Sequence, residues 1–293
     1  MAGDLTANVL TGTGQIQWRG LVLGDGTDYH VTSLTGWREL PGVDSGNVAR
    51  PSRHGSWPGR ALAQERTVTV EFNVVPMLPD DLPGRVAELV ANTALSEDGT
   101  DEPLVVNDFP PALVAYGQLV RRSLPQATGY AYGIASAALQ WVCSDPRLYS
   151  LDERVVTVLP PTSGVGGLDY PLAYPLTYGT PGTSGQAVAF NAGNTPTHPL
   201  VVIPGPAERP RVINETTGRT LEFDLTLTAA DSLTVDCDAG TVRLNQSADR
   251  LYTLTPRSVP VEAWTIPPGR STIRYQATSA GAAVTLTWRD AYL

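Results

Sequence analysis

The feature of this sequence that most constrains its fold is a strict alternation of apolar and polar residues in short runs bounded by turns. In Thr220–Thr228 every second residue is apolar, and Leu233–Asp238 repeats the pattern. Successive side chains of a strand point to opposite faces, so such a run buries one face and exposes the other to water. Gly218, in the preceding turn, can take the positive φ that a turn requires. The pattern predicts half-buried antiparallel strands and a mainly β chain.

Residues 1–150 predict an α+β domain, an antiparallel sheet or sandwich with one helix packed on it. The helix is expected at Asp80–Leu95, where Asp80 or Asp81 can cap the first turn and Pro83 fits within it. Its apolar stripe is Leu82, Val86, Leu89, Val90 and Thr93. Strands are expected around it at Gln15–Leu23, Tyr29–Leu34, Gln64–Val75, Pro103–Asn107, Ala112–Ser123 and Tyr130–Cys143.

A long segment in this first domain shows no periodicity. Trp37–Gly59 carries Gly, Pro, Ser and Asp at intervals, which predicts a loop or arm. Arg50, Arg53 and Arg60 make it the most basic part of an acidic chain. Two interpretations remain open: a solvated loop, or a contact with a neighbouring acidic subunit.

Residues 151–185 contain a connection between domains in which Tyr170, Tyr174 and Tyr178 recur with prolines. Proline removes ladder donors and fixes φ, so extended chain is expected there, after a strand at Glu153–Leu159. Residues 186–293 predict a β-sandwich of jelly-roll or galectin-like type. Its further strands are expected at Ala187–Asn191, Pro199–Ile203, Val242–Leu244, Ala263–Ile266, Thr272–Gln276 and Ala283–Trp288.

Composition excludes several classes of function. The net charge is −9 and every basic residue is arginine, which disfavours a protein that grips nucleic acid through its phosphates. Cys143 and Cys237 both fall on apolar strand faces and are expected to be buried free thiols. The N-terminus lacks a secretion signal and no apolar run reaches membrane-spanning length, so synthesis in the cytoplasm is expected.

Residues for catalysis or metal binding do not assemble into a motif. The three histidines, His30, His54 and His198, stand apart from one another and from partners at metal-ligand spacing. The chain has neither a nucleophile elbow nor a phosphate loop, and Asp236 and Asp238 fit a solvent-facing strand better than half a calcium loop. No enzyme, metal or cofactor is therefore expected. Trp264, Tyr275 and Trp288 are interpreted either as core anchors or as a platform on which sugars stack.

Turn and strand motifs along nearly the whole chain resemble one known family. They include NAGNTPTHP at Asn191–Pro199, the run from Ile213 through ETTGR to Asp236, and TLTWRDAYL at Thr285–Leu293. Further motifs are GSWPGRALAQERTVTVEF at Gly55–Phe72, SDPRLYS at Ser144–Ser150 and GLDYPLAYPLTYG at Gly167–Gly179. Together they make the chain similar to the distal tail proteins of siphophages, of the type found in actinobacteriophages.

The resemblance implies a structural virion protein without catalysis. Members of that family form a hexameric ring at the tip of a long non-contractile tail, between the tail tube protein and the tail-hub protein. Their second domain projects outward and can carry receptor-binding or sugar-binding parts. Two rivals are a carbohydrate-binding module that attaches to a host glycan, and a hydrolase of the cell wall.

Overall fold

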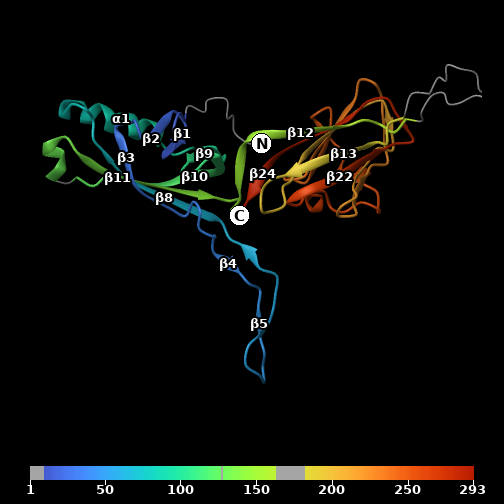
Figure 1. Ribbon diagram of the computed structural model, residues 1–293, viewed down its shortest axis with the longest axis horizontal. Helices are drawn as coiled ribbons and strands as arrows, with labels where there is room; N and C mark the ends of the chain where they lie inside the picture. Colours follow the sequence, from blue (N-terminus) through green and yellow to red (C-terminus); the bar gives the residue numbers. More distant parts are fainter. Residues whose placement is uncertain (1–9, 127, 163–181) are drawn as a thin grey trace, which may run out of the picture. The chain divides into compact units, whose positions relative to one another are not determined.

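The computed structural model describes residues 10–126, 128–162 and 182–293 (Figure 1). The chain divides into two compact units, unit 1 (Met1–Leu151 with Leu293) and unit 2 (Asp152–Tyr292). Both units consist mainly of antiparallel strands, and α1 is the single α-helix among the described residues. The prediction of a mainly β chain is confirmed.

Unit 1 contains a first sheet whose strands follow the order β2-β1-β9-β10-β12. The prediction of one strand at Gln15–Leu23 is wrong, because Arg19 takes a positive φ of 53° and turns the chain into a hairpin. The strands are β1 (Gln15–Trp18), β2 (Leu21–Gly24), β9 (Glu102–Asn107), β10 (Leu113–Ser123) and β12 (Leu148–Val158).

A second sheet of unit 1 runs β3-β8-β11-β10, so β10 belongs to both sheets. β10 changes partner from β9 to β11 midway, with a register shift between Leu119 and Arg121. The second sheet adds β3 (Tyr29–Thr35), β8 (Arg66–Val74) and β11 (Ala135–Cys143). The prediction of a strand from Tyr130 onward is wrong for its first residues, because Thr128–Tyr132 form the 3₁₀ helix η2.

The helix of unit 1 is shorter than predicted. A 3₁₀ turn, η1 (Pro79–Asp81), leads into α1 (Leu82–Asn92), which contacts β2 and β8. Asp81 occupies the N-cap position without a side-chain hydrogen bond. Leu82 and Leu89 are buried as the stripe predicts, whereas Val90 is exposed.

Between β3 and β8 the chain forms a long two-stranded arm, residues 40–63, which leaves the sheet in Figure 1. It pairs with itself in two short stretches, β4 with β7 and β5 with β6. Its strands are β4 (Val43–Asp44), β5 (Val48–Ala49), β6 (Ser56–Trp57) and β7 (Leu62–Ala63). Strands of two residues carry no readable periodicity, which is why the sequence shows only a loop or arm here.

Unit 2 is built from two main sheets and a small third one. In the first, β12 is followed by β24 (Val284–Tyr292), β14 (Leu200–Pro204), β19 (Ser232–Asp236), β20 (Thr241–Leu244) and β21 (Ala248–Asp249). The second contains β13 (Gln186–Asn191), β22 (Gly269–Gln276), β16 (Arg211–Asn214) and β17 (Arg219–Glu222). The third contains β18 (Thr226–Leu227), β15 (Ala207–Glu208) and β23 (Ser279–Ala280). Two 3₁₀ turns, η3 (Leu251–Thr253) and η4 (Val261–Ala263), complete the unit.

One core joins the two main sheets of unit 2, because buried residues of both pack in a single cluster. This is the sandwich arrangement that the alternating runs predict. Two details of the prediction are wrong. The strand expected at Thr220–Thr228 stops at Glu222, where Phe223 instead bridges to Leu254. Ala263–Ile266 is not a strand, since η4 occupies its start and only Ile266 forms a bridge.

Candidate subunit interface

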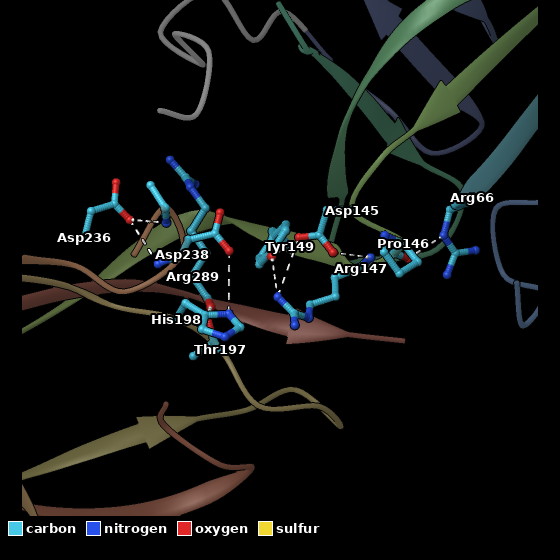
Figure 2. Close-up of polar contacts among 11 residues, drawn as sticks. Arg66, Asp145, Pro146, Arg147, Tyr149, Thr197, His198, Asp236, Asp238 and Arg289 are labelled. Atoms are coloured by element: carbon cyan, nitrogen blue, oxygen red, sulfur yellow. Dashed lines mark hydrogen bonds and ion pairs between the residues drawn. The ribbon is translucent and has the colours of Figure 1, made fainter. Parts of the chain in front are cut away.

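The arm is attached to the sheet through Arg66, the first residue of β8. Its buried guanidinium donates from Nη1 to the carbonyl oxygens of Gly36, Trp37 and Glu39 at 2.7, 2.8 and 2.9 Å. Its Nε donates to the carbonyl oxygen of Pro146 at 2.7 Å (Figure 2). Burial lowers the pKa of Arg66 below its usual value. One side chain thus holds the end of β3, the start of the arm and the turn after β11.

Two backbone segments, at Gly36 and at Thr67, approach each other closely at this attachment. Gly36 has a positive φ of 81°, and a Cβ atom there would lie 1.8 Å from the carbonyl oxygen of Thr67. Trp37 follows it and is buried in unit 1. A hollow of about 350 Å³ lies beside the attachment, lined by Gly36, Glu39, Leu40, Pro41, Gly42, Gln64, Glu65, Arg66 and Thr67. The base of the arm is therefore fixed to unit 1.

The arm keeps its two chains together at its middle and near its tip. Gly59 approaches Gly46 so closely that a Cβ atom on Gly59 would lie 2.2 Å from the Gly46 carbonyl oxygen. Gly59 also donates its N–H to Asn47 Oδ1 at 2.8 Å. Near the tip the N–H of Arg50 donates to the carbonyl oxygen of Gly55 at 3.2 Å. These contacts hold the two chains of the arm together as a hairpin.

Large apolar side chains on the arm are exposed to solvent. Trp57 is 60% exposed, and its register partner Val48 is 64% exposed. The exposed apolar residues of the arm are Leu40, Val43, Val48, Trp57 and Leu62. A soluble protein rarely shows water a series of apolar side chains on a thin projection unless a partner covers them. The arm is the candidate interface of this chain.

The three arginines singled out from the sequence all lie on this arm. The Arg50 guanidinium stacks over the Trp57 ring, 4.5 Å from the ring centroid. Arg53 and Arg60 are exposed. The structure therefore places them together on the projecting hairpin, while their contact with a partner stays a prediction.

The aromatic residues singled out from the sequence fall into two groups. Tyr170, Tyr174 and Tyr178 lie outside the described residues. Trp264 and Tyr275 are 0% exposed and Trp288 is 5% exposed, all three within the core of unit 2. Their rings offer no face on which a sugar can stack, so the stacking hypothesis fails and they are core anchors.

The motif NAGNTPTHP proves to be a structural turn centred on Asn191. Its buried Nδ2 donates to the carbonyl oxygens of Thr195 and Ile266 at 2.9 and 3.2 Å. Its Oδ1 accepts the N–H of Gly193 at 2.9 Å and that of Ala291 at 3.4 Å. One amide thereby ties the β13–β14 turn to β24 and to the chain before β22. Sequence reasoning recognised the motif but gave no role to this side chain.

Ion pairs fasten β24 of unit 2 beside that turn. Asp290 is buried, accepts the N–H of Ala192 at 3.0 Å and pairs with Arg154 at 3.1 Å. Arg289 pairs with Glu153 at 3.0 Å. Its carbonyl oxygen accepts the Thr197 hydroxyl at 2.8 Å, a contact drawn in Figure 2.

Other polar groups drawn in Figure 2 serve turns within their own units. Asp236 Oδ1 accepts the N–H groups of Asp238 and Ala239, both at 3.0 Å, which is an ordinary turn for an Asp side chain. Asp238 also lies 3.6 Å from His198 Nδ1. In unit 1, Asp145 accepts the Tyr149 hydroxyl. In the parts of the chain that the structure describes, no group of three or more His, Cys, Asp and Glu side chains is placed to hold a metal ion.

Cys143 and Cys237 are buried, one in each unit, and neither forms a disulfide. Burial raises the pKa of Cys143 to about 12 and raises the pKa of Cys237 as well. Because the thiolate is the reactive form, we expect neither thiol of the native protein to react with Ellman's reagent at pH 8. Both should react once the protein is denatured. Rapid labelling of the native protein would contradict their burial.

Within the described ranges, no helix has the length and apolar character needed to cross a membrane.

Comparison with known proteins identifies a related family. Residues 192–292 match the family described as "Siphovirus-type tail component, C-terminal domain". The match lies within unit 2 and covers most of it. The resemblance to siphophage distal tail proteins seen in the sequence is thus confirmed.

Solved phage structures share the fold over nearly the whole chain. The crystal structure of Dit from phage SPP1, described as a paradigm of the hub adsorption apparatus in phages that infect Gram-positive bacteria, has a TM-score of 0.66 at 15% identity. That alignment covers 95% of this chain and 99% of the other. A chain of the phage P2 baseplate, in its activated conformation with Ca, has a TM-score of 0.50 at 10% identity over 93% and 97%. No curated protein sequence matches the chain. At these identities the likeness shows the fold alone.

Proposed function

We propose that this chain is a ring-forming structural protein at the distal end of a long non-contractile phage tail. In the ring it joins the tail tube to the tail-tip hub and supports the parts that attach to the host. Unit 1 forms the ring and unit 2 projects from it. The observation that carries the proposal is the arm, an apolar and basic projection of unit 1 that lacks a covering sheet within its own unit.

The physical chemistry of the chain supports an assembled role. An exposed series of apolar side chains is a liability in a free monomer and a source of binding energy in an assembly. The arm carries Arg50, Arg53 and Arg60, while the whole chain has a net charge of −9. Copies of the chain therefore offer acidic surfaces to a basic arm, and an acidic ring lets DNA pass without binding it.

The family match and the shared fold both support this proposal. Residues 192–292 match a siphovirus-type tail-component domain, and the shared fold extends over nearly the full length of the SPP1 Dit chain. Because SPP1 Dit is described as part of a hub adsorption apparatus, we place this chain beside a hub. A six-membered ring, the tail tube and tail-hub proteins as partners, a receptor-binding protein or host glycan as a further partner, and a position at the virion tail tip all belong to this proposal. So does a role without catalysis.

Replacing the register pair Val48 and Trp57 by serine is expected to abolish self-assembly and leave the fold intact. Both side chains are exposed, so their removal should change the free energy of unfolding by no more than about 0.5 kcal/mol. The matched control replaces Val188 and Phe190, an exposed apolar pair on β13, by serine. Light scattering of the full chain should show rings for wild type and control and monomers for the arm variant. Undiminished rings in the arm variant would refute the proposed role of the arm.

A further inference from the structure

Three arginines of unit 2 surround one buried carboxylate, that of Glu222 at the end of β17. Glu222 pairs in register with Arg211 of β16, while the neighbouring Leu221 and Val212 belong to the core. Because side chains alternate along a strand, Glu222 and Arg211 lie on the outer face of this sheet. Glu222 is nonetheless only 6% exposed. A carboxylate on the outer face is thus enclosed by neighbouring side chains.

The three arginines come from separate segments, and all of them stay beyond hydrogen-bond distance from this carboxylate. Arg211 approaches from β16, with its Nε 3.9 Å from Glu222 Oε2. Arg209 Nη2 lies 3.8 Å from Glu222 Oε1, and Arg257 Nη1 lies 3.9 Å from Oε2. The Nε of Arg209 also lies 3.4 Å from Asp224 Oδ1. Distances of this size leave guanidinium N–H groups able to donate to a further acceptor.

Three polar atoms of this cluster are buried and, among the residues that the structure describes, have no hydrogen-bond partner. They are Glu222 Oε2, Arg211 Nε and the hydroxyl oxygen of Thr255. Thr255 lies beside Glu222, since its N–H donates to the Glu222 carbonyl oxygen at 2.9 Å. Buried polar atoms without a partner are rare in folded proteins, and a bound molecule that completes their bonding is one reason for them. Donors and an acceptor therefore both await a partner at this place.

We propose that this cluster binds a phosphate group carried by a polyol or a sugar. The guanidinium groups of Arg209, Arg211 and Arg257 donate to the phosphate oxygens, a geometry that suits the planar fork of arginine. The Thr255 hydroxyl donates to the same group, and a hydroxyl of the ligand donates to Glu222 Oε2. The side chains of Arg209 and Arg257 are 53% and 76% exposed, so they can turn to admit the ligand. Such a site serves unit 2 alone and is independent of ring assembly.

Charge and hydrogen-bonding capacity favour a polyol phosphate over a carboxylate of a protein partner. The cluster already holds the carboxylates of Glu222 and Asp224 beside its three arginines, which leaves an excess of one positive charge. A phosphodiester group carries one negative charge and balances that excess. A carboxylate ligand brings no donor for Glu222 Oε2, whereas a polyol phosphate brings acceptor oxygens and donor hydroxyls together.

A further arginine on the same face shows how a polymer would differ from a small ligand. Arg211 pairs with Gln276 at one end of β22, and Arg270 lies near the other end, on the same face and exposed. About 20 Å of strand separates the two positions, which is too far for one phosphate group and within reach of a short polymer. Between them, Arg274 is paired with Glu215 at 2.8 Å.

Calorimetric titration of the full chain with glycerol phosphate and with poly(glycerol phosphate), at low salt, tests the site. Wild type should bind the phosphate probe, and Arg257→Gln and Arg209→Gln should each weaken binding by about tenfold, because each removes charged donors. The matched control is Arg243→Gln, at an exposed arginine of β20 in the other main sheet of unit 2. It changes the net charge equally and should leave binding unchanged.

The variant Arg270→Gln distinguishes the two sources of the phosphate group. Weaker binding of the polymer alone would support the site with a polymer as its ligand. Unchanged binding of both probes would support the site with a free polyol phosphate as its ligand. Light scattering of the same variants should show the oligomer of the wild type, so that loss of the site and loss of the ring are seen separately.

Three results would overturn the inference. One is wild-type protein that binds neither probe. Another is Arg243→Gln weakening binding as much as Arg257→Gln, which would show that net charge alone attracts the probe. The third is poly(glutamate) binding as tightly as poly(glycerol phosphate), which would assign the cluster to an acidic protein segment.

Discussion

Replacing Arg66 with alanine is expected to lower the free energy of unfolding of unit 1 by about 3–5 kcal/mol and to abolish ring assembly. The substitution removes the donors that satisfy the carbonyl oxygens of Gly36, Trp37, Glu39 and Pro146. Each buried carbonyl left without a partner costs on the order of 1–3 kcal/mol, reduced where water can reach it. The arm would then lose its fixed attachment.

The measurement is chemical denaturation of the full chain combined with hydrogen exchange of residues 36–41 and 66–67. Arg60→Ala is the matched control, because Arg60 is exposed on the arm and its loss should cost no more than about 0.5 kcal/mol. Arg66→Lys should lie between the two, because one ammonium group cannot reach carbonyls spread around a guanidinium. Equal stabilities of Arg66→Ala and Arg60→Ala would show that the attachment does not depend on Arg66.

Replacing Asn191 with alanine is expected to destabilise unit 2 by about 2–4 kcal/mol. The change removes all four hydrogen bonds of one buried amide, and with them the partner that it gives to the carbonyl oxygen of Thr195. The carbonyl oxygen of Ile266 keeps the N–H of Thr197 as a donor at 3.0 Å. Because Ala291 lies in β24, the loss should loosen the end of that strand as well as the β13–β14 turn. Denaturation of the full chain, followed by tryptophan fluorescence, measures the effect.

Asn194→Ala provides the comparison for this second substitution. Asn194 lies in the same turn but its side chain is exposed, so its replacement should cost less stability than that of the buried Asn191. A variant at Asn191 that is as stable as the one at Asn194 would mean that the turn is held by its backbone hydrogen bonds and by Asp290, without help from the amide.

The sequence predicts best those strands that pack one face on the core and expose the other to water. In β8, Val68, Val70, Phe72 and Val74 are buried while Thr67 and Glu71 are exposed, so the alternation could be read directly. The hairpin at Arg19 was missed because the residue in the left-handed region is an arginine, and the single glycine beside it, Gly20, stands in an apolar run that also suits one strand. The 3₁₀ turn η2 was missed because its small and aromatic residues also suit a strand.

The candidate interface could be predicted only in part. The basic residues of the arm are visible in the sequence, and a segment of that length without periodicity indicates a projection or loop. The role of Arg66 is not visible, because an arginine that begins a strand ordinarily faces water. The exposure of Met77 and Tyr132 is equally hidden, since both look like core residues until the packing shows that they face solvent.

The mass of the purified full chain in solution, measured by light scattering with negative-stain images, tests the central claim most directly. We predict one closed ring of about six times the chain mass of 31.2 kDa, which dissociates when Val48 and Trp57 become serine. A chain that stays monomeric at every concentration, or one that grows into open filaments, would contradict the account.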